Sequence, residues 1–318
     1  MIIVIFIVGV IFLIAGAKIM VEGAKDIANH FHISSLAIGL TIVAFSTSIP
    51  ELLVSMKAMY EGYNNIVIFD LIGSNILNIL LILSIVSFIK PLKITNSTIK
   101  KELPLSILAT AIFTILALDD IFIPSKTNQI TRLDALVLIL FFIIYIFYMV
   151  KNIRSRSNIK TYESSNYPLS YSIFMTILGF SMIFLGSIFT VDMAYKLTSF
   201  GISDKILSVS IIAFATSIPE LITCLYFMKN NDEDMIIGNI LGSNIFNICI
   251  ALAIPVIIMG TLNINALSII DIVNFLLSAI ILVLFAPIKE KIGKFESTIM
   301  IIIFVIYYGY MLWEGLGI

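Results

Sequence analysis

Long apolar stretches recur along the whole of this 318-residue chain. A helix needs about 20 largely apolar residues to cross the hydrocarbon core of a bilayer. Because backbone polar groups cannot stay unpaired in lipid, each stretch of that length predicts a membrane-spanning helix. The chain is therefore predicted to be an all-α polytopic membrane protein. Ten stretches predict ten transmembrane helices: 2–24, 35–59, 65–89, 103–118, 129–150, 169–195, 205–228, 235–259, 266–287 and 296–316.

The composition excludes several other classes of protein. Hydrophobic residues make up 60% of the chain and charged residues only 12%, far from the balance of a soluble or disordered chain. The net charge of −1 leaves no basic surplus for nucleic acid. Two Cys and two His are too few to predict a disulfide framework or a zinc site. With no nucleotide loop or nucleophile–base pair either, we expect neither an enzyme nor a cofactor.

Clusters of basic residues orient the predicted spans. Lys and Arg gather between spans three and four, five and six, and nine and ten. With ten spans these loops share one side, which the positive-inside rule makes cytoplasmic. Both termini are then outside, and the polar segment 151–168 is a cytoplasmic linker between a first half, 1–150, and a second half, 169–318. We expect a monomer in the lipid bilayer of the cell membrane.

The two halves contain related motifs. Residues 43–55 read VAFSTSIPELLVS and residues 212–224 read IAFATSIPELITC, while residues 72–79 read IGSNILNI and residues 241–248 read LGSNIFNI. Both pairs are offset by 169 positions. Each half has five predicted spans, and an odd number makes the two copies cross the membrane in opposite senses. This predicts the inverted five-helix repeats of a secondary transporter, with the substrate site near the midplane.

Two acidic residues occupy equivalent places inside apolar segments. Glu51 and Glu220 each follow a Thr-Ser-Ile-Pro sequence, with no Lys or Arg within about a turn. A carboxylate inside a membrane is costly without a partner, so either both are protonated or a cation binds between them. Pro50 and Pro219 are expected to bend the helix and to free backbone carbonyls. Helical spacing places on the same faces Ala44, Thr47 and Ser48, and in the second copy Ala213, Thr216 and Ser217.

The second motif adds further oxygen atoms. Ser74 and Asn78 lie one helical turn apart, as do Ser243 and Asn247. Carboxylate, amide, hydroxyl and carbonyl oxygens without sulfur or imidazole form a hard donor set, which suits Ca²⁺, and smaller subsets suit Na⁺. The sequence therefore predicts a Ca²⁺ and Na⁺ site.

One further acid has no acidic counterpart. Asp70 lies one turn before Ser74 on the same helical face, and the equivalent position of the second copy holds Asn239. Asp70 is predicted to be a third ion ligand, a proton-binding site, or a residue at the mouth that attracts cations.

These motifs resemble the repeats of the sodium/calcium exchanger family, most closely over residues 36–80 and 205–250. The resemblance implies a central Ca²⁺ clamped by Glu51 and Glu220, with Na⁺ sharing the oxygens. It also implies alternating access by sliding of the first and sixth spans. Many relatives have Gly where this chain has Ser46 and Ala215, and prokaryotic relatives often have Asp where it has Asn247. The implied site is Thr47, Ser48, Glu51, Ser74, Asn78, Thr216, Ser217, Glu220, Ser243 and Asn247, with the carbonyls of Ala44 and Ala213.

The favoured hypothesis is an antiporter that exchanges Na⁺ for Ca²⁺. Ions that compete for one set of oxygens cannot fill it together, and an empty, doubly negative site is costly to close off from water. The first alternative is an antiporter of H⁺ and Ca²⁺, in which a buried acid trades its proton for the metal. A cation channel and an ion sensor are weaker alternatives.

Overall fold

The computed structural model describes residues 2–31, 34–118, 127–153, 167–198 and 211–316, and helices dominate these ranges. Within them, eight helical segments are long and apolar enough to cross a membrane. They lie on eight of the ten predicted spans. The segments are Val4–Ile27, Leu36–Glu61, Asn64–Ile89, Arg132–Met149, Leu169–Gly186, Glu233–Met259, Ile269–Pro287 and Lys294–Glu314.

The other two predicted spans are helical where the structure describes them. The seventh contains α12 (Ala213–Thr216) and α13 (Ile218–Lys229), and its predicted beginning at 205–210 lies outside the described residues. The fourth is α7 (Asn96–Ala117), which has 22 residues and is not as short as expected. Its first turn is polar, and Thr95 caps it by accepting a hydrogen bond from the Thr98 amide. The apolar pattern alone missed this capped turn.

The second and seventh spans are broken beside their prolines. The second consists of α2 (Ser35–Ile38), the π-helical turn η1 (Gly39–Val43), α3 (Ala44–Thr47) and α4 (Ile49–Glu61). Ser48 leaves the helical conformation between α3 and α4 (φ −91°, ψ 10°), as Ser217 does between α12 and α13 (φ −84°, ψ 2°). Proline lies in the first turn of the helix that follows each break, where its missing N–H costs no hydrogen bond. The predicted bends are confirmed.

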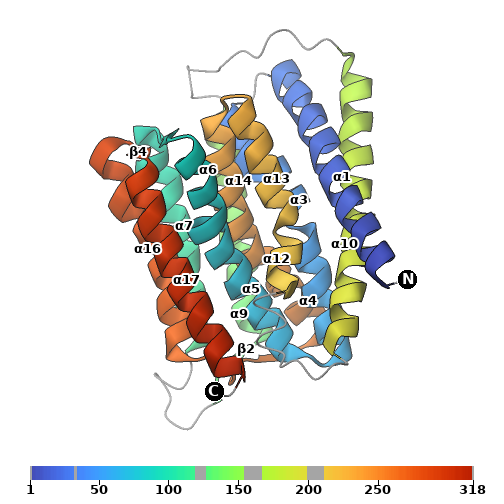
Figure 1. The fold of residues 1–318 in the computed structure, drawn as a ribbon, viewed down its shortest axis with the longest axis vertical. Helices are drawn as coiled ribbons and strands as arrows, with labels where there is room; N and C mark the ends of the chain where they lie inside the picture. Colours follow the sequence, from blue (N-terminus) through green and yellow to red (C-terminus); the bar gives the residue numbers. More distant parts are fainter. Residues whose placement is uncertain (1, 32–33, 119–126, 154–166, 199–210, 317–318) are drawn as a thin grey trace.

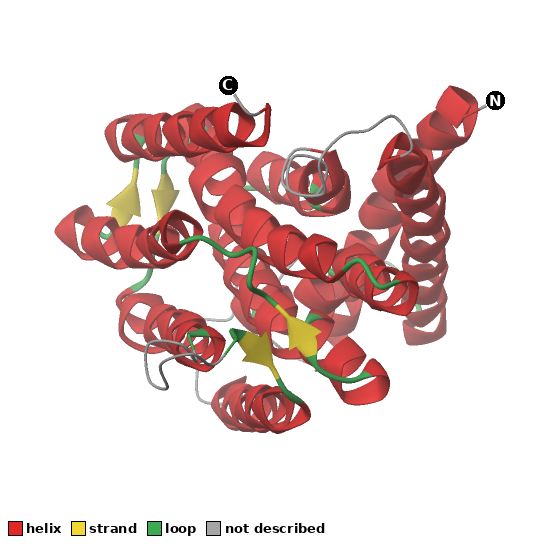
Figure 2. Cartoon of the chain, turned by 90° about the horizontal axis from the view of Figure 1, so that it is seen from below, coloured by secondary structure: helices red, strands yellow, loops and turns green. Residues whose placement is uncertain are grey.

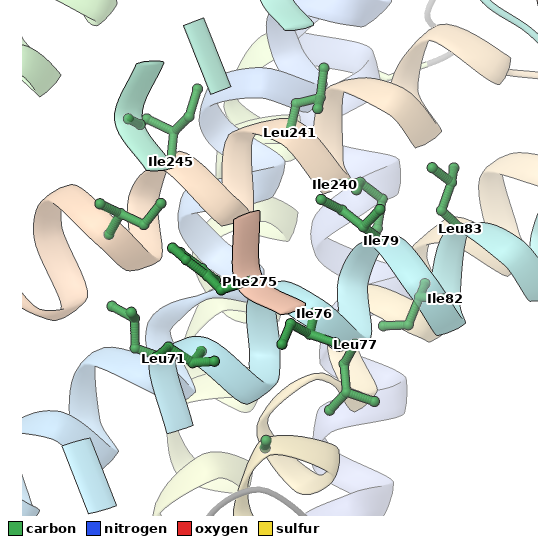
Figure 3. Packing of buried hydrophobic residues seen from close by; sticks show 14 of the residues in the cluster. Leu71, Ile76, Leu77, Ile79, Ile82, Leu83, Ile240, Leu241, Ile245 and Phe275 are labelled. Carbon is green, nitrogen blue, oxygen red and sulfur yellow. The ribbon is translucent and has the colours of Figure 1, made fainter. Parts of the chain in front are cut away.

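The third and eighth spans are the most deeply buried. The third is α5 (Asn64–Ile76), η2 (Leu77–Leu83) and α6 (Ser84–Ile89), and the eighth is α14 (Glu233–Phe246), η4 (Asn247–Ala251) and α15 (Ala253–Met259). Side chains of α5 and η2 pack against Ile240, Leu241 and Ile245 of α14 and against Phe275 (Figure 3). Both spans pass into π-helix at or beside the second asparagine of the motif, Asn78 or Asn247. Such π-turns are frequent at functional sites.

Two long helices form one side of the molecule. α1 (Ile2–Phe31) and α10 (Leu169–Thr198) run side by side along their length (Figure 1). Glycines let their backbones approach closely: a Cβ at Gly16 would lie 2.8 Å from the Gly179 carbonyl oxygen, and one at Gly179 only 2.4 Å from the Met20 amide nitrogen. Small residues at such crossings are typical of membrane helix pairs.

Two very short strand pairs were not expected in an all-α chain. β1 (Leu92–Lys93) pairs with β4 (Lys291–Ile292), and β2 (Gln129–Ile130) pairs with β3 (Leu262–Asn263), both antiparallel. Two residues are too few to give a strand pattern. The pairs lie at opposite ends of the helices, and each joins a loop of the first half to a loop of the second (Figures 1 and 2). The remaining helices are α9 (Arg132–Ile153), α16 (Ile269–Lys289) and α17 (Lys294–Leu316).

Candidate ion-binding site

The two glutamates of the repeated motif lie inside the helix bundle. Each is in the first turn of the helix after a break, Glu51 in α4 and Glu220 in α13. The positive end of the helix dipole favours a carboxylate at such a place. Glu51 is 1% exposed and Glu220 fully buried. Ser48, beside the first break, donates a hydrogen bond to Glu220 Oε1 (3.1 Å), and the two carboxyl groups are close enough for their charges to interact. The two motif copies therefore meet.

Thr47 and its neighbours form one oxygen cluster beside Glu220. Thr47 Oγ1 lies 3.3 Å from the Ala44 carbonyl oxygen, 3.4 Å from Ser243 Oγ and 3.2 Å from Asn239 Oδ1. Ser243 in turn donates to Glu220 Oε1 (3.3 Å). This group brings α3 and α14 together, and we call it the Thr47 cluster.

The residues at the matching positions of the repeated motifs form a second cluster, which we call the Thr216 cluster. Thr216 Oγ1 lies 3.2 Å from the Ala213 carbonyl oxygen, 3.4 Å from Ser74 Oγ and 3.4 Å from Asp70 Oδ1. The charges of Asp70 and Glu51 are close enough to interact. α12 and α5 thus repeat the arrangement of α3 and α14, with Asp70 in place of Asn239.

Four asparagines lie at the centre of the bundle. Asn78 Nδ2 donates to Asn244 Oδ1 (2.9 Å), and Asn247 Nδ2 donates to Asn75 Oδ1 (3.4 Å). The Asn244 amide also donates to the Asn75 carbonyl oxygen (3.3 Å). Sequence reasoning missed Asn75 and Asn244, although the same Gly-Ser-Asn motif contains them. Their role is to engage the amide N–H groups of Asn78 and Asn247.

Seven buried oxygens at this centre have no hydrogen-bond partner among the described residues. Buried polar atoms are normally paired, and a site that leaves so many acceptors unpaired suits a cation. No ion-pair partner of Glu51, Glu220 or Asp70 is found in the described part of the chain. The oxygens are Oε1 and Oε2 of Glu51, Oε2 of Glu220, Oδ2 of Asp70, Oδ1 of Asn78 and of Asn247, and Oγ of Ser217.

All thirteen predicted residues lie in the bundle interior, each with at most 4% of its surface exposed. Ala44 and Ala213 contribute their backbone carbonyl oxygens to the two clusters. The other residues belong to the site through the hydrogen bonds and unpaired oxygens described above. Asp70 is fully buried, so this conformation does not place it at an exposed mouth. Within the described ranges, no group of three or more His, Cys, Asp and Glu side chains is placed to hold a metal ion. The donors are instead paired glutamates with amide, hydroxyl and carbonyl oxygens.

Broken membrane helices around such a cluster define a class of protein. Helix ends inside the bundle present backbone carbonyls and dipoles to ions, which is the way secondary transporters build cation sites. The fold and the donor set are those of a membrane transporter for hard cations.

Comparison with known proteins identifies the family. The family model described as sodium/calcium exchanger protein matches residues 1–151 and 171–313. The chain therefore belongs to the sodium/calcium exchanger family, and the predictions of family, membrane location and antiporter class are confirmed.

Relatives cover 95% or more of the chain. An uncharacterized membrane protein of Methanocaldococcus jannaschii is 32% identical over 95% of both chains. The sodium/calcium exchanger MaX1 of Methanosarcina acetivorans is 23% identical over 95% of this chain and 96% of its own. A solved structure of the sodium-calcium exchanger NCX_Mj has a TM-score of 0.79 and 30% identity, covering 97% of this chain and 99% of that one.

Proposed function

We propose that this protein exchanges Na⁺ for Ca²⁺ through the site between its two motif copies. The observation that carries the proposal is the set of seven unpaired, buried oxygens, three of them on Glu51 and Glu220. Ca²⁺ takes six to eight oxygen ligands in flexible geometry, and two carboxylates balance its charge. Ca²⁺ is proposed to bind between Glu51 and Glu220, with Asn78, Asn247 and Ser217 supplying neutral oxygens.

Na⁺ is proposed to bind in the Thr47 and Thr216 clusters. Each cluster combines a hydroxyl-rich group with a backbone carbonyl in the last helical turn before the break, where the negative end of the helix dipole favours a cation. Both clusters adjoin the glutamates, so Na⁺ and Ca²⁺ compete for the same carboxylates. Closing an unloaded site would bury unpaired charge at a high cost. Competition together with this penalty makes the exchange obligatory.

The architecture proposed for this function is a pair of inverted five-helix repeats, 1–150 and 169–318, with ten membrane helices in all. The constant offset of 169 positions and the matched helix breaks at Ser48 and Ser217 support it. The segment 151–168 is proposed to be cytoplasmic, both termini outside, and the working unit a monomer without enzymatic activity or cofactor. Access is proposed to alternate as α1 and α10 slide together past the other helices.

Transport by purified protein in liposomes tests the function. An outward Na⁺ gradient should drive uptake of radioactive Ca²⁺, Glu51→Gln should abolish it, and Glu61→Gln, at the exposed end of the same helix, should retain it. If Glu51→Gln transported normally, the proposed site would be wrong. Ca²⁺ uptake driven by a pH gradient without Na⁺ would instead establish exchange with protons. Conductance without any counter-ion gradient would establish a channel.

A further inference from the structure

The two oxygen clusters match residue by residue except at one place. Thr47 corresponds to Thr216 and Ser243 to Ser74, always at the offset of 169 or its reverse. At the same offset, the Thr47 cluster contains the neutral Asn239 where the Thr216 cluster contains the acidic Asp70. One cluster therefore has a carboxylate that the other lacks.

Asn239 is engaged at both ends of its amide. Its Oδ1 accepts a hydrogen bond from Thr47 (3.2 Å), and its Nδ2 lies 3.6 Å from Cys224 Sγ as a donor. A neutral amide with both ends engaged holds α3, α13 and α14 together and adds no negative charge to the Thr47 cluster.

Asp70 is not satisfied in this way. Thr216 Oγ1 lies 3.4 Å from Asp70 Oδ1, but its single proton is shared with the Ala213 carbonyl oxygen (3.2 Å). Asp70 Oδ2 is buried without a partner among the described residues, and the side chain is fully buried. Its near neighbours are oxygen-bearing groups, including the Glu51 carboxyl and the Tyr308 phenol. In such surroundings the carboxyl group either holds a proton or, when it is ionised, needs a cation.

Asp70 and Asn239 lie toward opposite ends of the molecule. Asp70 lies six residues into α5, a span that leads on to β1, and Asn239 lies six residues into α14, a span that leads on to β3. β1 and β3 belong to the strand pairs at opposite ends of the bundle (Figure 1). Each residue is therefore near the end where its own span begins, at a depth of about 9 Å along the helix.

We propose that Asp70, with Thr216, Ser74 and the Ala213 carbonyl, forms a negatively charged position for a monovalent cation, Na⁺. The Thr47 cluster has no such charge. This inference rests on the proposed exchange and deepens it. Because the extra charge is near one end only, Na⁺ binds more tightly from that face of the membrane than from the other. The exchanger is thus asymmetric although its site is built from two matching halves.

Exchanging the two residues tests the inference. The variants are Asp70→Asn, Asn239→Asp and the double exchange. For each, the assay measures the Na⁺ concentration that gives half of the maximal Ca²⁺ flux. Membrane vesicles of the two orientations give this value for each face of the membrane. Asp70→Asn should raise this concentration about tenfold at one face and less than about twofold at the other. A tenfold change corresponds to a modest part of the attraction between the Asp70 carboxylate and a Na⁺ ion a few Å away. Asn239→Asp should lower it at the opposite face, and the double exchange should reverse the asymmetry.

Two results would overturn the inference. No effect of Asp70→Asn at either face would mean that Asp70 is a neutral packing group, and equal effects at both faces would mean that its charge acts on the whole site. If Asp70→Asn does not fold, Asn239→Asp tests the inference by itself. The asymmetry is refuted if this variant does not bind Na⁺ more tightly at one face than the wild type does. If the wild type shows no Na⁺-driven Ca²⁺ flux, the proposed exchange itself fails. The Asp70 position is then tested separately by thermal unfolding in detergent, where Na⁺ must stabilise the wild type more than Asp70→Asn.

Discussion

Replacing Glu51 with Gln separates the role of its charge from the role of its shape. Both carboxyl oxygens of Glu51 are buried without a hydrogen-bond partner in the described structure, whereas Glu220 Oε1 accepts from Ser48 and Ser243. Without ions, an ionised Glu51 is a buried charge with nothing to compensate it. The amide removes this charge with little change of volume, so the ion-free variant should be at least as stable as the wild type.

The effect of Ca²⁺ should be the opposite. Removing one partner from a buried charge pair costs about 3–5 kcal/mol, which weakens Ca²⁺ binding roughly 150- to 5,000-fold. At a Ca²⁺ concentration about 100 times the wild-type Kd, binding stabilises the wild type by about 2.7 kcal/mol. At the same concentration the variant gains less than about 0.3 kcal/mol.

Thermal unfolding in detergent measures both effects. In Na⁺-free buffer, Ca²⁺ should raise the Tm of the wild type by roughly 5 °C, and the Tm of Glu51→Gln should not respond. Glu61→Gln is the matched control on the same helix and should keep the full Ca²⁺ response. A Glu51→Gln variant with a normal Ca²⁺ response would refute the reasoning, since Ca²⁺ would then bind without that carboxylate.

Two further predictions concern packing and the asparagine network. Gly179→Ala places a Cβ 2.4 Å from the Met20 amide nitrogen, so α1 and α10 must move apart. The free energy of unfolding should fall by about 1–3 kcal/mol. The control is Gly309→Ala, whose Cβ meets no atom within 4 Å and which should not lower the Tm. Asn244→Ala removes the acceptor of the Asn78 amide, which should cost about 1–3 kcal/mol and weaken Ca²⁺-dependent stabilisation. A Ca²⁺ titration that matches the wild type would contradict the positioning role of Asn244.

The sequence was informative about features that depend on local pattern. Stretch length predicted the spans, proline predicted the breaks beside Ser48 and Ser217, and the duplicated motifs identified the paired acids and the family. Its errors were also local. The polar first turn of α7 begins with a cap at Thr95 rather than with apolar residues, and the two-residue strands carry no periodic signal.

Tertiary structure decided which atoms meet across the two copies. Neither the hydrogen bond from Asn78 to Asn244 nor the one from Asn247 to Asn75 can be read from spacing, because partners that lie far apart in sequence come together only when whole helices pack. The same holds for Asp70, whose difference from Asn239 is plain in the sequence. Its burial against Thr216 with one oxygen unpaired became known only from the fold. Sequence identifies which residues a membrane must accommodate, and packing determines which of their oxygens remain for an ion.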